Sequence, residues 1–274
     1  MEKITNEFLK RSISAVVYVL LVVASLFISP ATFVIVFAFF MSMCIYEFHK
    51  IINQQPEVNV PRWLSMGISL LLFLISFFYF SGRAFLPIFS YYIILIFWMF
   101  IRELFLKNPN PVHNWAYFLL GQVWIALPFS LLNFIVYFNN YQPLLILSIF
   151  ILVWMNDTGA YLIGITLGKH KMIPRVSPHK SWEGFAGGIL VTLLTGYLLS
   201  LWLYQLDLPQ WLFMSLIVSI FATFGDLLES LWKRTFQIKD SGNAIPGHGG
   251  FLDRFDSLLM VVPAVLIYLI FLFN

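Results

Sequence analysis

Long apolar runs follow one another along almost the whole chain, and they constrain its fold more than any other feature. Each run holds about 20 residues, the length that an α-helix needs to cross a hydrocarbon core of about 30 Å. We place nine predicted spans at residues 12–29, 31–48, 63–81, 84–104, 115–137, 141–163, 183–205, 208–230 and 252–273. The runs are continuous rather than alternating, which argues against a membrane β-barrel. The sequence therefore predicts an all-α, polytopic integral membrane protein.

Composition and proline positions refine this prediction. Hydrophobic residues make up 60% of the chain and charged residues 11%, whereas roughly a quarter of the residues in soluble domains are charged. Pro30, Pro128 and Pro143 lie within or beside predicted spans, so the boundaries there could be drawn differently. A second apolar run follows the first almost at once, so we interpret the first as a retained helix. Cys44 is the only cysteine, which excludes an intramolecular disulfide.

The basic residues favour one orientation in the membrane, because cytoplasmic loops carry an excess of Lys and Arg. With nine spans and a cytoplasmic N-terminus, fifteen of the sixteen basic residues fall inside and only Arg83 lies outside. The inside set is Lys3, Lys10, Arg11, Lys50, Arg62, Arg102, Lys107, Lys169, Lys171, Arg175, Lys180, Lys233, Arg234, Lys239 and Arg254. We therefore expect the N-terminus and the polar loops of the C-terminal half to be cytoplasmic.

The two halves of the chain differ in chemistry. Residues 1–150 are predicted to be N-terminal transmembrane helices that act mainly as a scaffold, and 151–274 to be a C-terminal catalytic region with polar loops at about 164–182 and 231–251. Polar residues near span ends in the first half are interpreted as side chains that reach the interface: Glu47, His49, Glu103 and His113. Glycines spaced four apart predict close helix packing: Gly164 with Gly168 and Gly184 with Gly188.

Four carboxylates of the C-terminal half are arranged in two pairs. Asp226 and Glu229 are three residues apart and share one helix face, and Asp253 and Asp256 repeat that spacing on the last helix. If the two helices are adjacent and antiparallel, the four groups converge on an oxygen-rich site that suits Mg²⁺. The alternative is structural: Asp253 caps a helix start and Asp256 pairs with Arg254 or another base.

A glycine-rich segment, KDSGNAIPGHGG, lies between the two pairs. Glycines allow the backbone to approach a ligand closely, and exposed amides before a helix can hold a phosphate. Gly249 and Gly250 are the candidates here, although such a segment alone is usually only a connector. Positive charge for a polyphosphate is supplied by Lys233, Arg234, Lys239 and Arg254. His248 is a candidate proton carrier or phosphate donor.

The preceding polar loop adds further candidates. Asn156 and Asp157 at the end of the sixth span, with Lys180 and Glu183 at the start of the seventh, are predicted to face one cavity. Ser177, followed by proline, marks the approach to that seventh helix.

Together these residues resemble the signature of the phosphatidate cytidylyltransferases, the CDP-diacylglycerol synthases. The matching positions are Ser177-Pro178-x-Lys180-Ser181-x-Glu183-Gly184, Gly225-Asp226-Leu227-x-Glu229-Ser230-x-x-Lys233-Arg234, Lys239-Asp240-x-Gly242 and Pro246-x-His248-Gly249-Gly250-x-x-Asp253-Arg254-x-Asp256. The motifs cover about 156–257. Trp232 and Ser181 depart from the family pattern without removing a charged group.

The resemblance implies the reaction of CTP with phosphatidate to give CDP-diacylglycerol and diphosphate, with Mg²⁺ required. Our hypothesis assigns roles by residue. Metal binding is assigned to Asp226, Glu229, Asp253 and Asp256, which leave room for a second cation. Catalytic phosphate neutralisation and positioning are assigned to His248, Lys233, Arg234 and Arg254. Substrate binding is assigned to Asn156, Asp157, Ser177, Lys180, Lys239, Gly249 and Gly250.

The resemblance also implies a cell (inner) membrane location, the lipid bilayer as surroundings, no nucleic-acid partner and a homodimer. Two other functions stay open. A CTP-dependent polyisoprenoid or lipid alcohol kinase would use the γ-phosphorus of CTP instead of the α-phosphorus. A membrane transporter would also carry intramembrane carboxylates, although typically spread through the bilayer as a relay.

Overall fold

A computed structural model describes residues 2–242, 244 and 249–273, with side chains from residue 12 onward. His248 lies outside the described residues, so its predicted catalytic role stays a prediction from the sequence. The chain forms two compact units, one of Met1–Tyr141 with Asp240–Arg254 and one of Gln142–Lys239 with Phe255–Asn274. The boundary predicted at residue 150 divides a scaffold from a catalytic region, whereas these two units are defined by contacts within the fold. The predicted boundary therefore stays a prediction.

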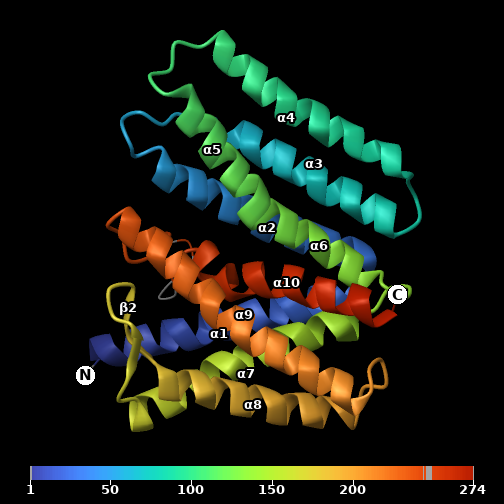
Figure 1. The fold of residues 1–274 in the computed structure, drawn as a ribbon, viewed down its shortest axis with the longest axis vertical. Coiled ribbons are helices and arrows are strands. Elements are labelled where there is room, and N and C mark those ends of the chain that lie inside the picture. The colour runs from blue at the N-terminus through green and yellow to red at the C-terminus, as the bar shows by residue number, and fades with distance from the viewer. Residues whose placement is uncertain (1, 243, 245–248, 274) are drawn as a thin grey trace. The chain divides into compact units, whose positions relative to one another are not determined.

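The first unit is a set of packed helices (Figure 1). Its elements are α1 (Glu2–Ile28), α2 (Pro30–Ile52), α3 (Arg62–Phe80), the 3₁₀ turn η1 (Leu86–Ile88), α4 (Phe89–Leu104), α5 (Pro111–Gly121), the π-helical turn η2 (Gln122–Ala126) and α6 (Leu127–Val136). α2 packs against α1 and α3, and α3 packs against α4 and α6. The start of α10 (Leu252–Phe273) also belongs to this unit.

Prolines mark where these helices begin or change geometry. Ser29 caps α2 in a reciprocal arrangement with Thr32, and Pro30 takes the first turn, where its missing N–H costs nothing. Pro128 lies just after the π-helical turn, inside one continuous helical stretch. A proline within a helix removes one backbone hydrogen bond, which accounts for the change of helix geometry here. Pro143 starts α7.

Polar side chains in the first unit are buried and hydrogen-bonded. His49 is fully buried and its Nε2 lies 2.7 Å from Ser65 Oγ. Glu103 is 4% exposed and accepts hydrogen bonds from Asn108 and Asn114 at 2.8 and 3.0 Å. Glu47 is also 4% exposed. The interpretation of these three residues as interfacial side chains is therefore wrong, because other residues of the same unit supply their partners.

The second unit contains α7 (Pro143–Leu167), β1 (Lys171–Ile173), β2 (Ser177–Ser181), α8 (Trp182–Ser200), α9 (Leu208–Thr235) and the remainder of α10. α7 and α8 pack against each other over an extensive contact. A Cβ on Gly184 would lie 2.8 Å from Ala160 O, and one on Gly188 would lie 2.7 Å from Asn156 Oδ1. The predicted packing role of both glycines is confirmed. Gly168 instead ends α7 as its C-terminal cap.

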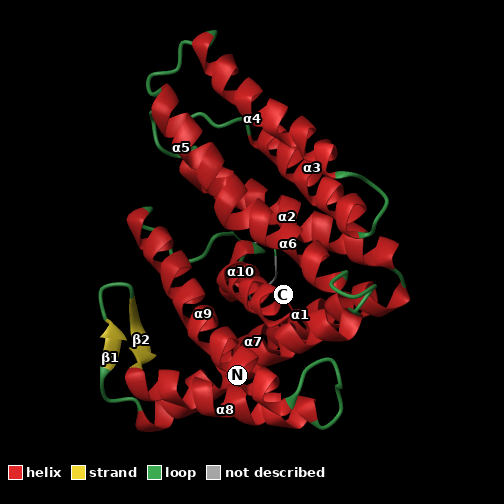
Figure 2. Ribbon diagram, turned by 45° about the vertical axis from the view of Figure 1, so that its right-hand side comes forward, coloured by secondary structure: helices red, strands yellow, loops and turns green. Residues whose placement is uncertain are grey.

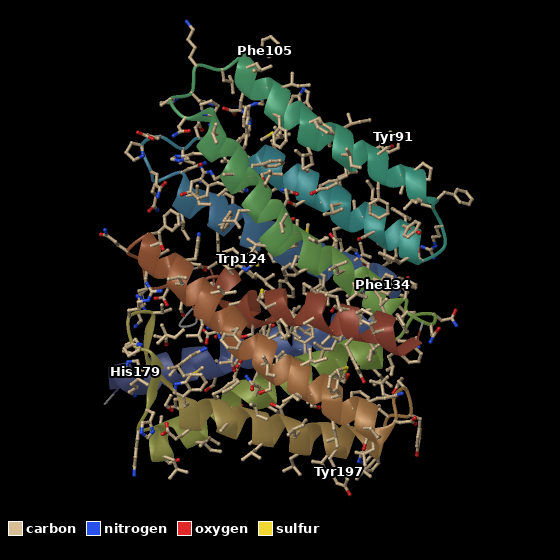
Figure 3. The ribbon with its side chains drawn as sticks, in the orientation of Figure 1. Tyr91, Phe105, Trp124, Phe134, His179 and Tyr197 are labelled. Atoms are coloured by element: carbon tan, nitrogen blue, oxygen red, sulfur yellow. The ribbon has the colours of Figure 1, made fainter. Side chains whose placement is uncertain are left out.

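Between α7 and α8 the chain forms a short hairpin, which the sequence prediction treated only as a polar loop (Figure 2). β1 and β2 pair antiparallel, with Lys171 opposite Ser181 and Ile173 opposite Ser177. His179 lies on β2 and is exposed, as the side-chain view shows (Figure 3). The hairpin leads directly into α8, whose N-cap is Ser181.

Eight helical segments in the described part of the chain are long and apolar enough to cross a membrane. They correspond to the second to ninth predicted spans, with boundaries shifted by a few residues. The first predicted span lies in α1, whose apolar part, Ser12–Ile28, is shorter than the other eight. The protein is thus an all-α, multi-pass membrane protein.

Candidate active site

A carboxylate of α9 and a lysine of the hairpin form an ion pair in the second unit. Asp226 Oδ2 lies 2.5 Å from Lys180 Nζ, and Lys180 also donates to the Thr223 carbonyl at 3.3 Å. Ser230 Oγ donates to Asp226 Oδ1 at 3.2 Å. The Asp226 carboxylate is therefore held from two sides, while 34% of its side chain remains exposed.

Asp256 of α10 joins the same cluster. Its carboxyl group is within hydrogen-bonding reach of Glu229 and interacts electrostatically with Asp226 and Lys233. Glu229 is fully buried and lies 3.4 Å from Lys233 Nζ, one turn further along α9. The predicted convergence of α9 and α10 carboxylates is therefore present for these three acids.

A glycine allows the two helices to approach each other at this point. A Cβ on Gly225 would lie 2.8 Å from Asp256 O and 3.1 Å from Ser257 Cα. Real side chains do not tolerate the first of these distances, so only glycine fits beside the first turns of α10. Gly225 directly precedes Asp226. The close approach of α9 and α10 at Gly225 therefore brings the Asp226 carboxylate near Asp256.

Asp157 of α7 is the fourth acid of this cluster. It interacts electrostatically with Asp226, Asp256 and Lys180. Its neighbour Asn156 is buried, and the Asn156 amide oxygen accepts a hydrogen bond from Ser219 Oγ of α9 at 2.5 Å. Asn156 thus has a clear packing contact, while its substrate-binding role stays a prediction.

We name Asp157, Lys180, Asp226, Glu229, Lys233 and Asp256 the carboxylate–lysine cluster. Four carboxylates and two ammonium groups leave a formal excess of two negative charges when all are ionised. Charge of one sign in a membrane protein requires a partner. Oxygen ligands of this kind suit Mg²⁺, which is usually held by one or two carboxylates together with water and substrate phosphate.

The cluster fits such an ion only with help from other ligands. Among residues 2–242, 244 and 249–273, no three Asp, Glu, His or Cys side chains are arranged to hold a metal by themselves. Asp226 and Asp256 therefore provide ligand chemistry that water and phosphate oxygens would complete.

Asp253 lies in the first unit and has different neighbours. Its carboxylate accepts hydrogen bonds from the Ser241 amide at 2.9 Å, the Ser241 hydroxyl at 3.0 Å and the Gly250 amide at 2.8 Å. Gly249 has a φ of 84°, a conformation that favours glycine. The Gly250 amide is thus directed at a carboxylate of its own chain, which agrees with the capping alternative for Asp253.

The remaining predicted residues are positioned as follows. Arg234 binds backbone carbonyls, those of Val176 at 3.4 Å and Ile238 at 3.2 Å, so it fastens the hairpin and the end of α9. Ser177 begins β2, and Lys239 and Arg254 are exposed. The prediction that Glu183 faces the same cavity as Lys180 is wrong. The Glu183 carboxylate instead accepts hydrogen bonds from the amides of Lys169 and His170.

The sequence reasoning missed Glu47, which binds the start of α10. The only available signal was a charge within the apolar stretch Cys44–Phe48, and nothing in the sequence indicated its partners 194 and 205 residues away.

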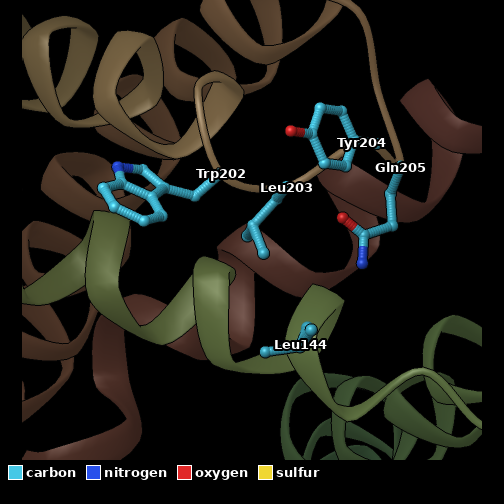
Figure 4. A pocket seen from close by; sticks show the side chains of 5 residues that line it. All are labelled: Leu144, Trp202, Leu203, Tyr204 and Gln205. Carbon is cyan, nitrogen blue, oxygen red and sulfur yellow. The ribbon is translucent and has the colours of Figure 1, made fainter.

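One pocket of the second unit lies away from this chemistry (Figure 4). It has a volume of about 350 Å³ and is lined by Leu144, Trp202, Leu203, Tyr204 and Gln205. These residues follow the C-terminal end of α8 or begin α7, whereas Lys180 precedes the N-terminal end of α8. The pocket lining contains no charged group, so the pocket is not the candidate active site.

Comparison with known proteins gives the family. The model of the cytidylyltransferase family matches residues 9–272. A phosphatidate cytidylyltransferase of Bacillus subtilis is 40% identical over 170 residues, 61% of this chain and 62% of the relative. Proteins of the same name from Staphylococcus haemolyticus and Staphylococcus epidermidis are 48% and 47% identical over 127 residues, 46% of this chain and 48% of each relative. The alignments thus span between about half and three fifths of the relatives' length. This chain belongs to the cytidylyltransferase family.

Proposed function

We propose that this protein is a phosphatidate cytidylyltransferase. An oxygen of the phosphatidate phosphate attacks the α-phosphorus of CTP, the bond between the α-phosphorus and the bridging oxygen breaks, and diphosphate leaves. CDP-diacylglycerol remains in the membrane. The names of the relatives and the family membership support the reaction class.

The observation that carries the proposal is the carboxylate–lysine cluster. Two highly charged anions must be brought together, so the protein's main task is positioning and charge neutralisation. Acids from α7, α9 and α10 and a lysine from β2 meet in one unit, which is what an ion-assisted reaction of phosphates requires. A general base is unnecessary, because the phosphatidate phosphate is already ionised at neutral pH.

Asp226 and Asp256 would hold Mg²⁺, with Glu229 and Asp157 as further acids for a second cation. When bound, the ion would neutralise and orient the CTP phosphates. Lys180 keeps the Asp226 carboxylate in place through the 2.5 Å ion pair and supplies positive charge of its own. Lys233 does the same beside Glu229.

The location follows from the same proposal. The distribution of basic residues supports a cytoplasmic N-terminus in the cell membrane, which would put the hairpin and the segment after α9 on the side where CTP is available. We further propose a homodimer, which native mass spectrometry of the detergent-solubilised protein would test.

The decisive experiment uses CTP carrying a label on either the α- or the γ-phosphorus. Purified protein in detergent receives phosphatidate, Mg²⁺ and one labelled nucleotide. Cytidylyl transfer predicts α-label in the lipid fraction, γ-label in released diphosphate and no lipid product when EDTA removes the metal. γ-Label in lipid would instead identify a kinase. If neither the α-label nor the γ-label entered the lipid fraction, the proposed reaction would be contradicted. Uptake of labelled CTP into proteoliposomes would then favour transport.

A further inference from the structure

Glu47, near the C-terminal end of α2, is a buried glutamate of the first unit. It is 4% exposed and sits between apolar residues of a helix long enough to cross a membrane. Burying an ionised carboxylate is costly unless hydrogen bonds or opposite charge compensate it. The partners of Glu47 therefore show what the residue stabilises.

All its described hydrogen-bond partners belong to the segment around the start of α10. Glu47 Oε2 accepts hydrogen bonds from Leu252 N at 3.0 Å and from Ser241 Oγ at 3.1 Å. The Phe251 amide is a further donor. The first amides of a helix have no partner within the helix, and the helix dipole favours an anion there. Glu47 thus acts as an N-terminal anchor for α10, supplied by a helix about 200 residues earlier in the chain.

Ser241 connects this anchor to a second carboxylate. Its hydroxyl lies 3.1 Å from Glu47 Oε2 and 3.0 Å from Asp253 Oδ2. Asp253 in turn accepts the amides of Ser241 and Gly250. Ser241 is the third residue of the glycine-rich segment and Gly250 is its last, so the two carboxylates hold the segment near its start and at its end.

The glycines of the segment fit closely around the glutamate. A Cβ on Gly242 would lie 2.7 Å from Glu47 Oε1, and one on Gly250 would collide with Glu47 Oε2 and Ser241 Oγ. Two glycines at these positions are therefore required by the presence of the Glu47 side chain, in addition to any contact with a ligand.

We infer that Glu47 is a positioning residue for the glycine-rich segment. It holds Ser241 near the start of the segment and the amides of Phe251 and Leu252 after it, so that Gly249 and Gly250 are preorganised for the nucleotide phosphates. The inference rests on the proposed function for the identity of the ligand, but not for the anchoring itself. The N-terminal half consequently contributes to the reaction through one buried carboxylate.

The test compares Glu47→Gln with Glu103→Gln in the full-length protein. Glu103 is equally buried at 4%, but its side-chain hydrogen bonds come from Arg102, Asn108 and Asn114 rather than from residues 240–252. Hydrogen–deuterium exchange is measured by mass spectrometry on peptides from 240–252. Glu47→Gln should accelerate exchange there by about tenfold or more, because hydrogen bonds to a charged group are lost. Glu103→Gln should leave those peptides unchanged.

Kinetics separate positioning from general destabilisation. Glu47→Gln should raise the KM for CTP by roughly tenfold and leave the KM for phosphatidate within about twofold, whereas a smaller folded fraction would lower only the apparent kcat. If Glu47→Gln yields too little folded protein, Gly242→Ala, which presses on Glu47 Oε1, should show the same local acceleration.

Unchanged exchange in residues 240–252 for the folded Glu47→Gln variant would overturn the anchoring. Accelerated exchange with an unchanged KM for CTP would overturn the role in nucleotide binding. A wild type that transfers no cytidylyl group would refute the proposed function, while the exchange experiment would still decide the anchoring.

Discussion

At the scale of single residues, the pairing of Lys180 with Asp226 places a positive charge directly on a proposed metal ligand. The lysine comes from β2 and the aspartate from α9, so the short hairpin has a defined task in the cluster. Carboxylates and lysines were recognisable from residue types and i, i+3 spacing. Their exact partners were not, because the hairpin brings Lys180 to a helix that begins only 28 residues later in the chain.

Replacing Lys180 by methionine should lower kcat/KM for CTP by about tenfold or more, since an electrostatic contact to the reacting phosphates and to Asp226 is lost. Steady-state assays with α-labelled CTP measure the effect. Lys171→Met, an exposed position of the same hairpin, is the matched control and should stay within about twofold of wild type. Equal losses in the two variants would show that only the net charge of the hairpin matters.

At the scale of helices and strands, the membrane-spanning helices could be predicted from the sequence. Runs such as those of α3 and α7 were recognisable because lipid requires continuous apolar helices. The hairpin was missed because its second strand, SPHKS, lacks apolar alternation and is stabilised by pairing with β1 and by the Glu183 contacts. The burial of Glu103 and His49 was also missed, because it depends on which helices pack together.

The contact between α9 and α10 gives a prediction at this scale. Gly225→Ala should destabilise the protein by about 1–3 kcal/mol, because the added methyl group would press on the Asp256 carbonyl. Thermal unfolding in detergent measures this change, and cytidylyl transfer should fall with it.

Gly67→Ala on α3 is the control, since no described atom lies within 4 Å of its added Cβ. Alanine favours a helix over glycine by about 1 kcal/mol, so this variant should be as stable as wild type or slightly more so. A Gly225→Ala protein as stable and active as Gly67→Ala would refute the close approach of the two helices.

At the scale of the whole molecule, sequence and structure divide the chain differently. The sequence suggested a scaffold followed by a catalytic region, with a boundary at residue 150. In the structure, residues 240–254 belong with the N-terminal helices, because Glu47, Ser241 and Leu252 are bonded across about 200 residues. No local pattern encodes such a contact, so the proposed phosphate-binding segment could be located in the sequence but not its support.

The orientation in the membrane is testable with single cysteines. Cys44 is buried and should not react with a membrane-impermeant maleimide. On intact cells, Tyr204→Cys, at a position that is 91% exposed between α8 and α9, should be labelled from outside. Glu57→Cys, exposed between α2 and α3, should react only after the membrane is opened. The reverse pattern would place the N-terminus outside.

The most direct measurement of the central claim is cytidylyl transfer by Asp226→Asn and Asp256→Asn across a Mg²⁺ titration. Loss of a metal-binding carboxylate should lower turnover by about 100-fold or more at saturating Mg²⁺. Asp207→Asn, an exposed acid at the start of α9, is the control and should retain wild-type turnover. Turnover within about threefold of wild type in both cluster variants, at every Mg²⁺ concentration, would contradict the assignment of the carboxylate–lysine cluster as the active site.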